Sequence, residues 1–184
     1  EALVAFRELG DRPSEGNALH LLARVNRQDG LLDQAAAAIS QALQIASEAD
    51  SSMMEAHWLA ELARIQLARG EPAEALTTSQ RSAVIQRRLG DRSREAVALD
   101  LTGQAYQQLA RYEEAVGFHR RAVTVHRQLG DRWQAANALA HLAAALDHCG
   151  DADEARSCRR EAADLLSGFD DPVADDLRRR LTTT

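Results

Sequence analysis

The tetrapeptide Leu-Gly-Asp-Arg occurs three times in this chain, beginning at residues 9, 89 and 129. These positions are separated by 80 and 40 residues, so the candidate repeat unit is 40 residues long. A chain with a fixed internal period of this size folds as stacked copies of one small unit, because each copy buries its apolar surface against its neighbours. The period therefore limits the possible folds to repeat architectures.

Alignment of the chain with itself at this spacing, without gaps, places residues of similar size together. Large apolar residues share one position, which holds Leu19, Leu59, Leu99 and Leu139. Small residues share two others, which hold Ala23, Ala63, Gly103 and Ala143, and Ala35, Ala75, Ala115 and Ala155. Within each unit, apolar residues recur three and four apart in two stretches, which predicts an all-α fold of antiparallel helix pairs. The predicted helices are 14–28, 32–47, 53–68, 72–88, 93–109, 112–128, 133–148 and 151–166.

The tetrapeptide falls where the second helix of one unit joins the first helix of the next. Its glycine can adopt the left-handed conformation that ends a helix, and its aspartate can cap the following helix. At residue 49 the sequence reads Ala-Asp-Ser-Ser instead. Asp50 and the serines still supply capping groups, but without glycine we expect a different backbone and a different angle at this joint. Ala110 likewise stands where other units have a glycine between their two helices.

The third unit carries the best match to a known motif, W-x2-L-G-x2-Y followed by two spaced alanines. Its matching residues are Leu99, Thr102, Gly103, Tyr106, Ala115 and Ala122. On these residues the chain resembles the tetratricopeptide repeat family over residues 13–168. It departs from the pattern in the length of its units, since the family's repeat has 34 residues, and in having leucine at the tryptophan position. The resemblance implies a right-handed α-solenoid whose inner face is lined by the first helix of each unit.

This interpretation divides the chain into six segments. Residues 1–12 are expected to be the second half of a helix from a truncated preceding repeat, and 172–184 a C-terminal capping helix and tail whose Val173, Leu177 and Leu181 share one face. Between them lie four repeats, 13–52, 53–92, 93–132 and 133–171.

The resemblance also implies a binding face on the first helix of each unit. Its candidate ligand- or peptide-binding residues are Asn17, His20, Arg24, Arg27, His57, Arg64, Asp100, Gln104, Gln107, Gln108, Asn137 and Asp147. Arginine suits an acidic partner because its planar guanidinium pairs with carboxylates through two hydrogen bonds. We therefore expect a partner that is acidic near Arg24, Arg27 and Arg64. The alternative is that these residues are simply the solvated face of amphipathic helices.

Catalysis, cofactors and metals are not expected. The sequence has no phosphate-binding glycine loop, no nucleophile motif and no dinucleotide fingerprint. His141, His148, Cys149 and Cys158 lie near one another in the sequence but lack the spacing of a zinc motif. The two cysteines fit a reducing cytoplasm better than a disulfide scaffold. Acidic residues outnumber basic ones by 28 to 22, which argues against direct nucleic acid contact, and no apolar run is long enough for a membrane span.

The predicted function is therefore that of a protein- or peptide-binding module. The 40-residue units with these joints resemble the C-terminal repeat arrays of bacterial transcriptional regulators of the AfsR and MalT types. That resemblance implies a cytoplasmic sensor that contacts other domains of its own full-length chain. Two alternatives stay open: a scaffold or self-association module that forms homo-oligomers, and a sensor of peptide pheromones.

Overall fold

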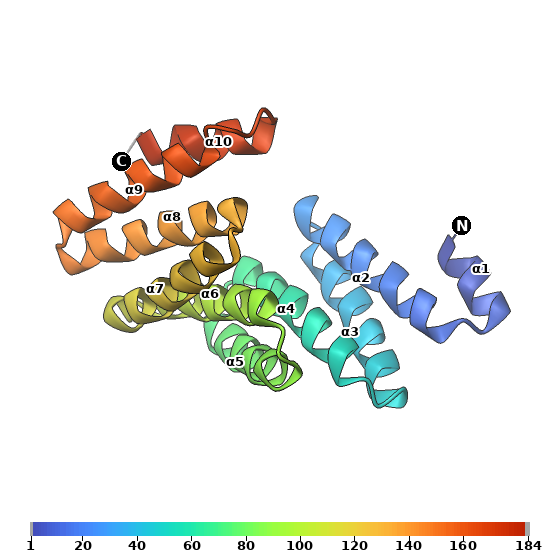
Figure 1. Ribbon diagram of the computed structural model, residues 1–184. Coiled ribbons are helices and arrows are strands. Elements are labelled where there is room, and N and C mark those ends of the chain that lie inside the picture. Colours follow the sequence, from blue (N-terminus) through green and yellow to red (C-terminus); the bar gives the residue numbers. More distant parts are fainter. Residues whose placement is uncertain (1, 183–184) are drawn as a thin grey trace. The chain divides into compact units, whose positions relative to one another are not determined.

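The computed structural model of the protein describes residues 2–182, and within that range all regular secondary structure is helical (Figure 1). This confirms the predicted all-α fold. The described helices are α1 (Ala2–Leu9), α2 (Arg12–Gln28), α3 (Leu32–Glu48), α4 (Ser52–Arg69), α5 (Pro72–Leu89), α6 (Arg92–Gln108), α7 (Tyr112–Leu129), α8 (Arg132–Cys149), α9 (Ala152–Leu166) and α10 (Pro172–Thr182). The eight helices predicted from periodicity correspond to α2 through α9, with ends that differ by at most two residues.

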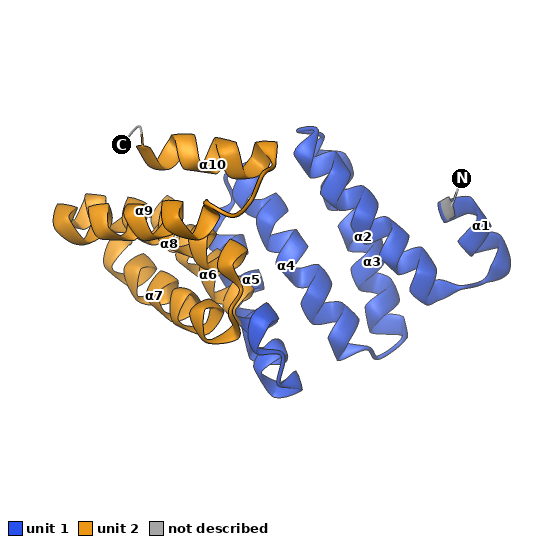
Figure 2. Ribbon diagram, turned by 45° about the horizontal axis from the view of Figure 1, so that its top comes forward, with its two compact units in different colours: residues 1–95 blue, residues 96–184 orange. Residues whose placement is uncertain are grey.

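The chain divides into two compact units, residues 1–95 and 96–184 (Figure 2). In the first unit, α2 packs on α3, α3 on α4, and α4 on α5. Its core is built from large side chains set among alanines, with Leu19, Ile39, Trp58 and Ile65 almost fully buried. Gly16 leaves room for Trp58, because a Cβ atom at this position would overlap the indole ring.

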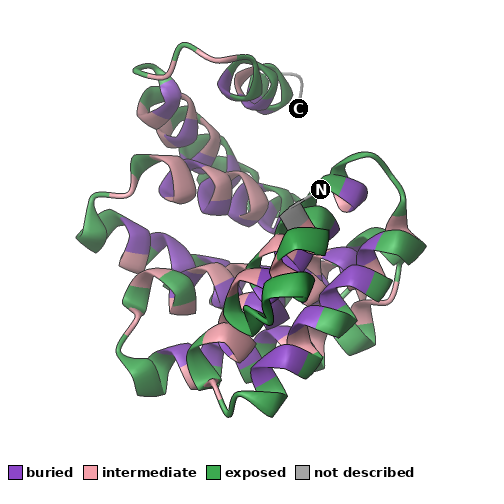
Figure 3. Cartoon of the chain, turned by 90° about the vertical axis from the view of Figure 1, so that its right-hand side faces the viewer, coloured by how far each residue is buried: buried purple, intermediate pink, exposed green. Residues whose placement is uncertain are grey.

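The second unit contains most of α6 and all of α7 to α10. Helix α8 packs against both α7 and α9, and α10 packs on α9. Its most buried large apolar side chains include Leu139, Leu146 and Leu166. Figure 3 shows this pattern of burial along the helices: the buried residues form stripes, while the turns between helices are exposed. Helices with one apolar stripe are stable in such a stack because each stripe is covered by a neighbour.

The buried face of α10 differs from the one expected. Ala174, Leu177 and Leu181 are buried, whereas Val173 is 60% exposed. Residues 174, 177 and 181 follow the spacing of three and four that keeps side chains on one side of a helix. Residue 173 lies one position away, so its side chain turns outward. A small residue, Ala174, thus makes the contact that was assigned to valine.

The joints at the three tetrapeptides have the predicted geometry. Gly10, Gly90 and Gly130 have φ angles of 67°, 74° and 69°, in the left-handed region. The aspartate that follows each glycine caps the next helix, because its Oδ1 accepts a hydrogen bond from a main-chain N–H three residues later, at 3.2, 2.9 and 3.0 Å in turn. The tetrapeptide is therefore a helix stop followed by a helix start.

The joint at residues 49–52 keeps the same backbone without glycine, so the expectation of a different backbone is wrong. Asp50 has a φ of 47°, and the Ser51 N–H donates to the Ala46 carbonyl at 2.9 Å. At the glycine-containing joint, the Asp91 N–H donates to the Gln86 carbonyl at 3.0 Å in the same way. Aspartate tolerates the left-handed region better than most residues. The hydrogen bonds that close the helix therefore dictate the backbone here, and the residue type adapts to them.

Candidate functional site

The predicted face of the first unit brings two histidines together. His20 on α2 and His57 on α4 have ring centroids 4.7 Å apart, with the rings inclined at 62°. Burial, and after it the neighbouring His20, Arg94 and Arg64, together lower the pKa of His57 to about 4. Burial also lowers the pKa of His20. Both rings are therefore neutral at physiological pH, and they form a packing contact between α2 and α4.

A buried carboxylate lies between two of the predicted arginines. Glu61 on α4 is 2% exposed. Its Oε1 accepts a hydrogen bond from Arg27 Nε at 2.7 Å, and its Oε2 lies 3.5 Å from an Arg64 guanidinium nitrogen. Arg27 and Arg64 are thus brought together, and they share one negative charge. The net positive charge that this region offers to a partner is smaller than the sequence suggested.

The solvent-exposed side of α2, which includes Asn17 and Arg24 of the predicted binding face, carries a mixed apolar and basic surface. Asn17, Leu21, Arg24 and Gln28 are exposed and follow the spacing of four, three and four that places residues along one side of a helix. Leu21 and the adjacent Val25 are each 49% exposed. Arg24 forms no ion pair with any residue that the structure describes. We call Asn17, Leu21, Arg24, Val25 and Gln28 the outer α2 face.

In the second unit, the predicted residue Asp100 binds two histidines from the next two helices. Its Oδ1 lies 2.7 Å from His119 Nδ1 on α7, and its Oδ2 lies 2.9 Å from His141 Nδ1 on α8. His119 is fully buried, whereas the side chain of His141 is 36% exposed. We call Asp100, His119 and His141 the Asp-His-His cluster.

The pKa values in this cluster reflect the attraction between the Asp100 carboxylate and the two imidazoles. Burial favours the neutral form of Asp100, but the neighbouring His141 and His119 outweigh it and hold the carboxyl pKa well below its ordinary value. For His141, burial acts to lower the pKa, and Asp100 raises it above its ordinary value. Asp100 is therefore ionised at physiological pH.

Two predicted glutamines hold the cluster in place. Gln104 donates from Nε2 to Asp100 Oδ2 at 3.0 Å. Gln107 accepts from His119 Nε2 at 2.9 Å, and its own amide nitrogen donates to the His141 main-chain oxygen at 3.3 Å. Asp100, Gln104 and Gln107 are thus brought together, as an internally bonded group on one side of α6.

The other predicted residues of the second unit lie outside this group. Gln108 is exposed near the end of α6. Asn137 donates to the Trp133 carbonyl of its own helix at 2.9 Å, and Asp147 pairs with Arg159. Asn137 and Asp147 line a pocket of about 250 Å³ between α8, α9 and α10, into which His141 also faces.

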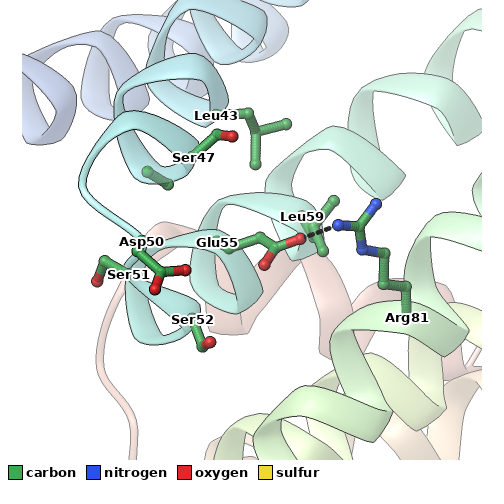
Figure 4. Close-up of a pocket in the computed structure, with 9 residues that line it drawn as sticks. Leu43, Ser47, Asp50, Ser51, Ser52, Glu55, Leu59 and Arg81 are labelled. Carbon is green, nitrogen blue, oxygen red and sulfur yellow. Dashed lines mark hydrogen bonds and ion pairs between the residues drawn. The ribbon is translucent and has the colours of Figure 1, made fainter.

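A separate pocket of about 290 Å³ lies beside the joint at residues 49–52 (Figure 4). Serines 47, 51 and 52, the carboxylates of Asp50 and Glu55, and Arg81 line it, and Arg81 pairs with Glu55 across one side. None of the predicted site residues contributes to it. The pocket lies between α3, the start of α4 and α5, within the first unit.

The predicted set missed Glu61, His119 and His141. The 40-residue period places Glu61 and His141 at one repeat position, where Leu21 and Leu101 stand in the other units. It places His119 at the position of Ile39 and Ser79. For Glu61 and His141, a polar residue at a position that is apolar in the other units was therefore the available signal. The position of His119 also holds Ser79 and Arg159, so it gave no such signal. The resemblance to the family assigned the binding face to other positions, and His141 was weighed only as a zinc ligand and rejected for lack of a motif.

Comparison with known proteins relates this chain to one repeat family. Residues 53–128 match the tetratricopeptide repeat family. The comparison with curated proteins gave no match.

Several solved structures share the fold. BtubC (BKLC) from P. vanneervenii has a TM-score of 0.78 and 17% identity, over 99% of this chain and 79% of that one. The TPR-like repeats of a kinesin light chain from Podosopora anserina have a TM-score of 0.70 and 19% identity, over 91% and 85%. A signal transduction ATPase with numerous domains from Pyrococcus horikoshii, which has a tetratricopeptide repeat sensor, has a TM-score of 0.72 and 18% identity. That match covers 92% of this chain but only 25% of the ATPase.

At these identities the likeness concerns the fold. The helix pairs, the family match and the solved structures agree with one another. The chain is thus an all-α solenoid of the tetratricopeptide repeat type, and its residues 53–128 match that family in sequence.

Proposed function

We propose that this chain is a protein- or peptide-binding module that uses the outer α2 face in its first unit. The observation that carries the proposal is the exposure of Leu21 and Val25 beside Arg24. Exposed apolar side chains next to arginine are typical of protein-binding surfaces, where arginine is enriched. A tetratricopeptide repeat fold supports the same class of function.

The chemistry of this face favours a partner segment with apolar and acidic side chains. Arg24 is exposed and lacks an ion pair among the described residues, so its guanidinium can pair with a carboxylate of the partner. Arg27 and Arg64 already share Glu61 and contribute less. Of the three arginines expected to contact an acidic partner, we therefore assign the contact to Arg24. His20 and His57 serve the packing of α2 against α4.

We further propose that the module is the sensor region of a larger bacterial regulator of transcription, divided into the four repeats predicted above. The ATPase from Pyrococcus horikoshii supports this, because it carries a tetratricopeptide repeat sensor within a much longer chain. In this proposal the module is not itself an enzyme and acts in the cytoplasm. Among residues 2–182, no helix has the length and apolar character needed to cross a lipid bilayer.

The binding proposal is tested with peptides selected by the protein itself. A library of random peptides displayed on phage is selected on the immobilised chain, and enriched peptides are synthesised with a fluorescent label. Their affinity is measured by fluorescence anisotropy for the parent chain, for Arg24→Ala and for Leu21→Ala. Arg88→Ala is the matched control, because Arg88 is an exposed arginine on α5, outside the predicted face.

The expected result is enrichment of acidic peptides with apolar residues, and a loss of affinity of about tenfold or more in the two α2 variants. Arg88→Ala should bind like the parent chain. Equal affinities of all variants, or the absence of enriched peptides, would contradict the proposal.

Self-association is a second candidate, favoured by the same exposed Leu21 and Val25. In that case the outer α2 face would bind another copy of the chain. Light scattering at increasing protein concentration separates the two candidates. A dimer in the parent chain that is lost in Leu21→Arg supports self-association, whereas a monomer at all concentrations supports a different partner.

A further inference from the structure

The Asp-His-His cluster has the composition of a metal site. Its three ligand atoms, one from each residue, all lie within 4.8 Å of one another. Two imidazoles and one carboxylate are a common ligand set for zinc and other divalent transition metals. The residues come from α6, α7 and α8 of the second unit and lie 41 residues apart at most, with no recognisable spacing motif.

The hydrogen bonds around His119 place a lone pair where a cation is needed. Gln107 donates its amide N–H to the His141 carbonyl, so its Oε1 faces His119 and must accept the hydrogen bond from Nε2. Neutral imidazole carries one N–H, so its Nδ1 then presents a lone pair. This nitrogen lies 2.7 Å from a carboxylate oxygen of Asp100, which presents lone pairs as well. A cation, either a proton or a metal ion, must lie between them.

The second nitrogen of the cluster faces the same carboxylate. His141 Nδ1 lies 2.9 Å from Asp100 Oδ2. Asp100 is thus bracketed by two imidazole nitrogens, one on each oxygen. A metal-binding histidine usually donates a hydrogen bond from its other ring nitrogen to a neighbouring oxygen, and this bond fixes the orientation of the ring. Gln107 supplies that oxygen for His119.

The dimensions require a small opening of the cluster. Ligand atoms around tetrahedral zinc lie about 3.3 Å apart, because the individual bonds are about 2.0–2.2 Å long. The separations of 2.7 and 2.9 Å are those of hydrogen bonds to the two different oxygens of Asp100, so the oxygen that binds the ion must move about 0.5 Å away from its histidine nitrogen. His141 is partly exposed and can make this movement, whereas His119 is fixed by its surroundings.

The site is open to solvent on the side of His141. This residue lines the pocket between α8, α9 and α10, which gives an ion a path to the cluster and leaves room for a water ligand. Arg180 also lines the pocket, but it pairs with Asp176 at 3.1 Å, so its charge is offset. Three protein ligands and one open position form a recognised type of zinc coordination.

We propose that Asp100, His119 and His141 bind one divalent transition-metal ion, with zinc as its representative, at the junction of α6, α7 and α8. The ion takes His119 Nδ1, His141 Nδ1 and an Asp100 oxygen as ligands. It links three successive helices of the second unit. This site is independent of the outer α2 face, which lies in the other unit.

The test uses Zn²⁺ titration of the untagged chain by calorimetry, and Co²⁺ titration followed by visible absorption. The variants are Asp100→Asn and His141→Ala, with circular dichroism to verify that each is folded. The matched control is the double variant His148→Ala/Cys149→Ala. These two residues are exposed on the same helix as His141 and are the alternative ligands on α8.

The expected result is one Zn²⁺ per chain in the parent and in the control. Asp100→Asn and His141→Ala should each weaken Zn²⁺ binding by about 100-fold or more. Removing a metal ligand weakens the affinity more than removing a residue that only forms a hydrogen bond to a ligand. Co²⁺ should give the intense visible bands of tetrahedral coordination in the parent and control alone. Zn²⁺ should also raise the melting temperature of the parent but not of Asp100→Asn.

Two results would overturn the proposal. One is the absence of Zn²⁺ binding to the parent chain above that of Asp100→Asn, which would mean that only protons bridge the cluster. The other is loss of binding in His148→Ala/Cys149→Ala with binding retained in Asp100→Asn, which would assign the ion to the surface of α8.

Discussion

Arg27 and Glu61 form a hydrogen-bonded ion pair between α2 and α4, with 2.7 Å between Arg27 Nε and Glu61 Oε1. The carboxylate is buried, and the guanidinium is partly exposed. The pair therefore joins two helices that are not neighbours in sequence, at the cost of removing a carboxylate from water. It also reduces the positive charge on a face that was predicted to attract acidic partners.

The first prediction concerns this carboxylate. Glu61→Gln keeps the shape of the side chain but removes the negative charge that pairs with Arg27, so the free energy of unfolding should fall by about 1–3 kcal/mol. Denaturant unfolding measures the change. Glu154→Gln is the control, because Glu154 forms an exposed pair with Arg120, and it should change stability by about 0.5 kcal/mol or less. Equal effects of the two substitutions would show that the buried pair has no special role.

The second prediction concerns the room that Gly103 gives to His119. A Cβ atom at residue 103 would lie 2.5 Å from His119 Cε1 and 2.7 Å from each ring nitrogen. The ring cannot retreat, because it is buried and hydrogen-bonded on both sides. Gly103→Ala should therefore destabilise the protein by about 1–3 kcal/mol.

Gly117→Ala is the matched control for Gly103→Ala. It lies within α7, and a Cβ atom there would have no neighbour within 4 Å. Alanine is favoured over glycine inside a helix, so this variant should be more stable by about 0.5–1 kcal/mol. Opposite signs for the two glycines are the expected outcome in thermal melts.

The third prediction concerns the two non-glycine residues in the left-handed region. Ala110 has a φ of 58° and Asp50 a φ of 47°. Ala110→Gly should stabilise the protein by about 1 kcal/mol, because glycine adopts this conformation without steric cost. Asp50→Gly should have a smaller effect, since aspartate tolerates the region better than alanine.

Gly70→Ala provides the reverse test of the left-handed positions. Its φ is 73°, and a Cβ atom there would meet nothing within 4 Å, so any loss of stability comes from the backbone alone. A stabilising Gly70→Ala would contradict the argument.

The fourth prediction is a pH dependence that arises from His57. Its pKa is about 4 in the folded protein, against an ordinary value of 6.5, because of burial and then of nearby positive groups. Below pH 6.5 the unfolded chain binds a proton at His57 that the folded chain does not. The free energy of unfolding should therefore decrease as the pH falls from about 6.5 to about 4, by up to about 3 kcal/mol.

Chemical unfolding at a series of pH values measures this loss. His57→Gln should flatten the pH dependence in this range, because glutamine does not titrate. His148→Gln, on the exposed end of α8, should leave it unchanged. A parent protein whose stability rises between pH 6 and pH 4 would contradict the assignment.

The sequence by itself determined the helices and their joints. Periods of three and four within a larger period of 40 place the apolar stripes, and these stripes are a local property of each helix. Gly10, Gly90 and Gly130 end helices because no other residue adopts positive φ so easily. The aspartate that follows each glycine stands just before the next helix, so its side chain can accept a hydrogen bond from the first turn of that helix. Such interactions span only a few residues, so they can be read from a single sequence.

Tertiary structure decided which polar side chains meet. Arg27 and Glu61 are 34 residues apart, and Asp100 and His141 are 41 residues apart. Their contacts depend on the rotation of each helix about its axis, which a difference of one residue changes by about 100°. This is why Asp100, Gln104 and Gln107 were predicted but Glu61, His119 and His141 were not. The same rotation placed Val173 in solvent and Ala174 in the core.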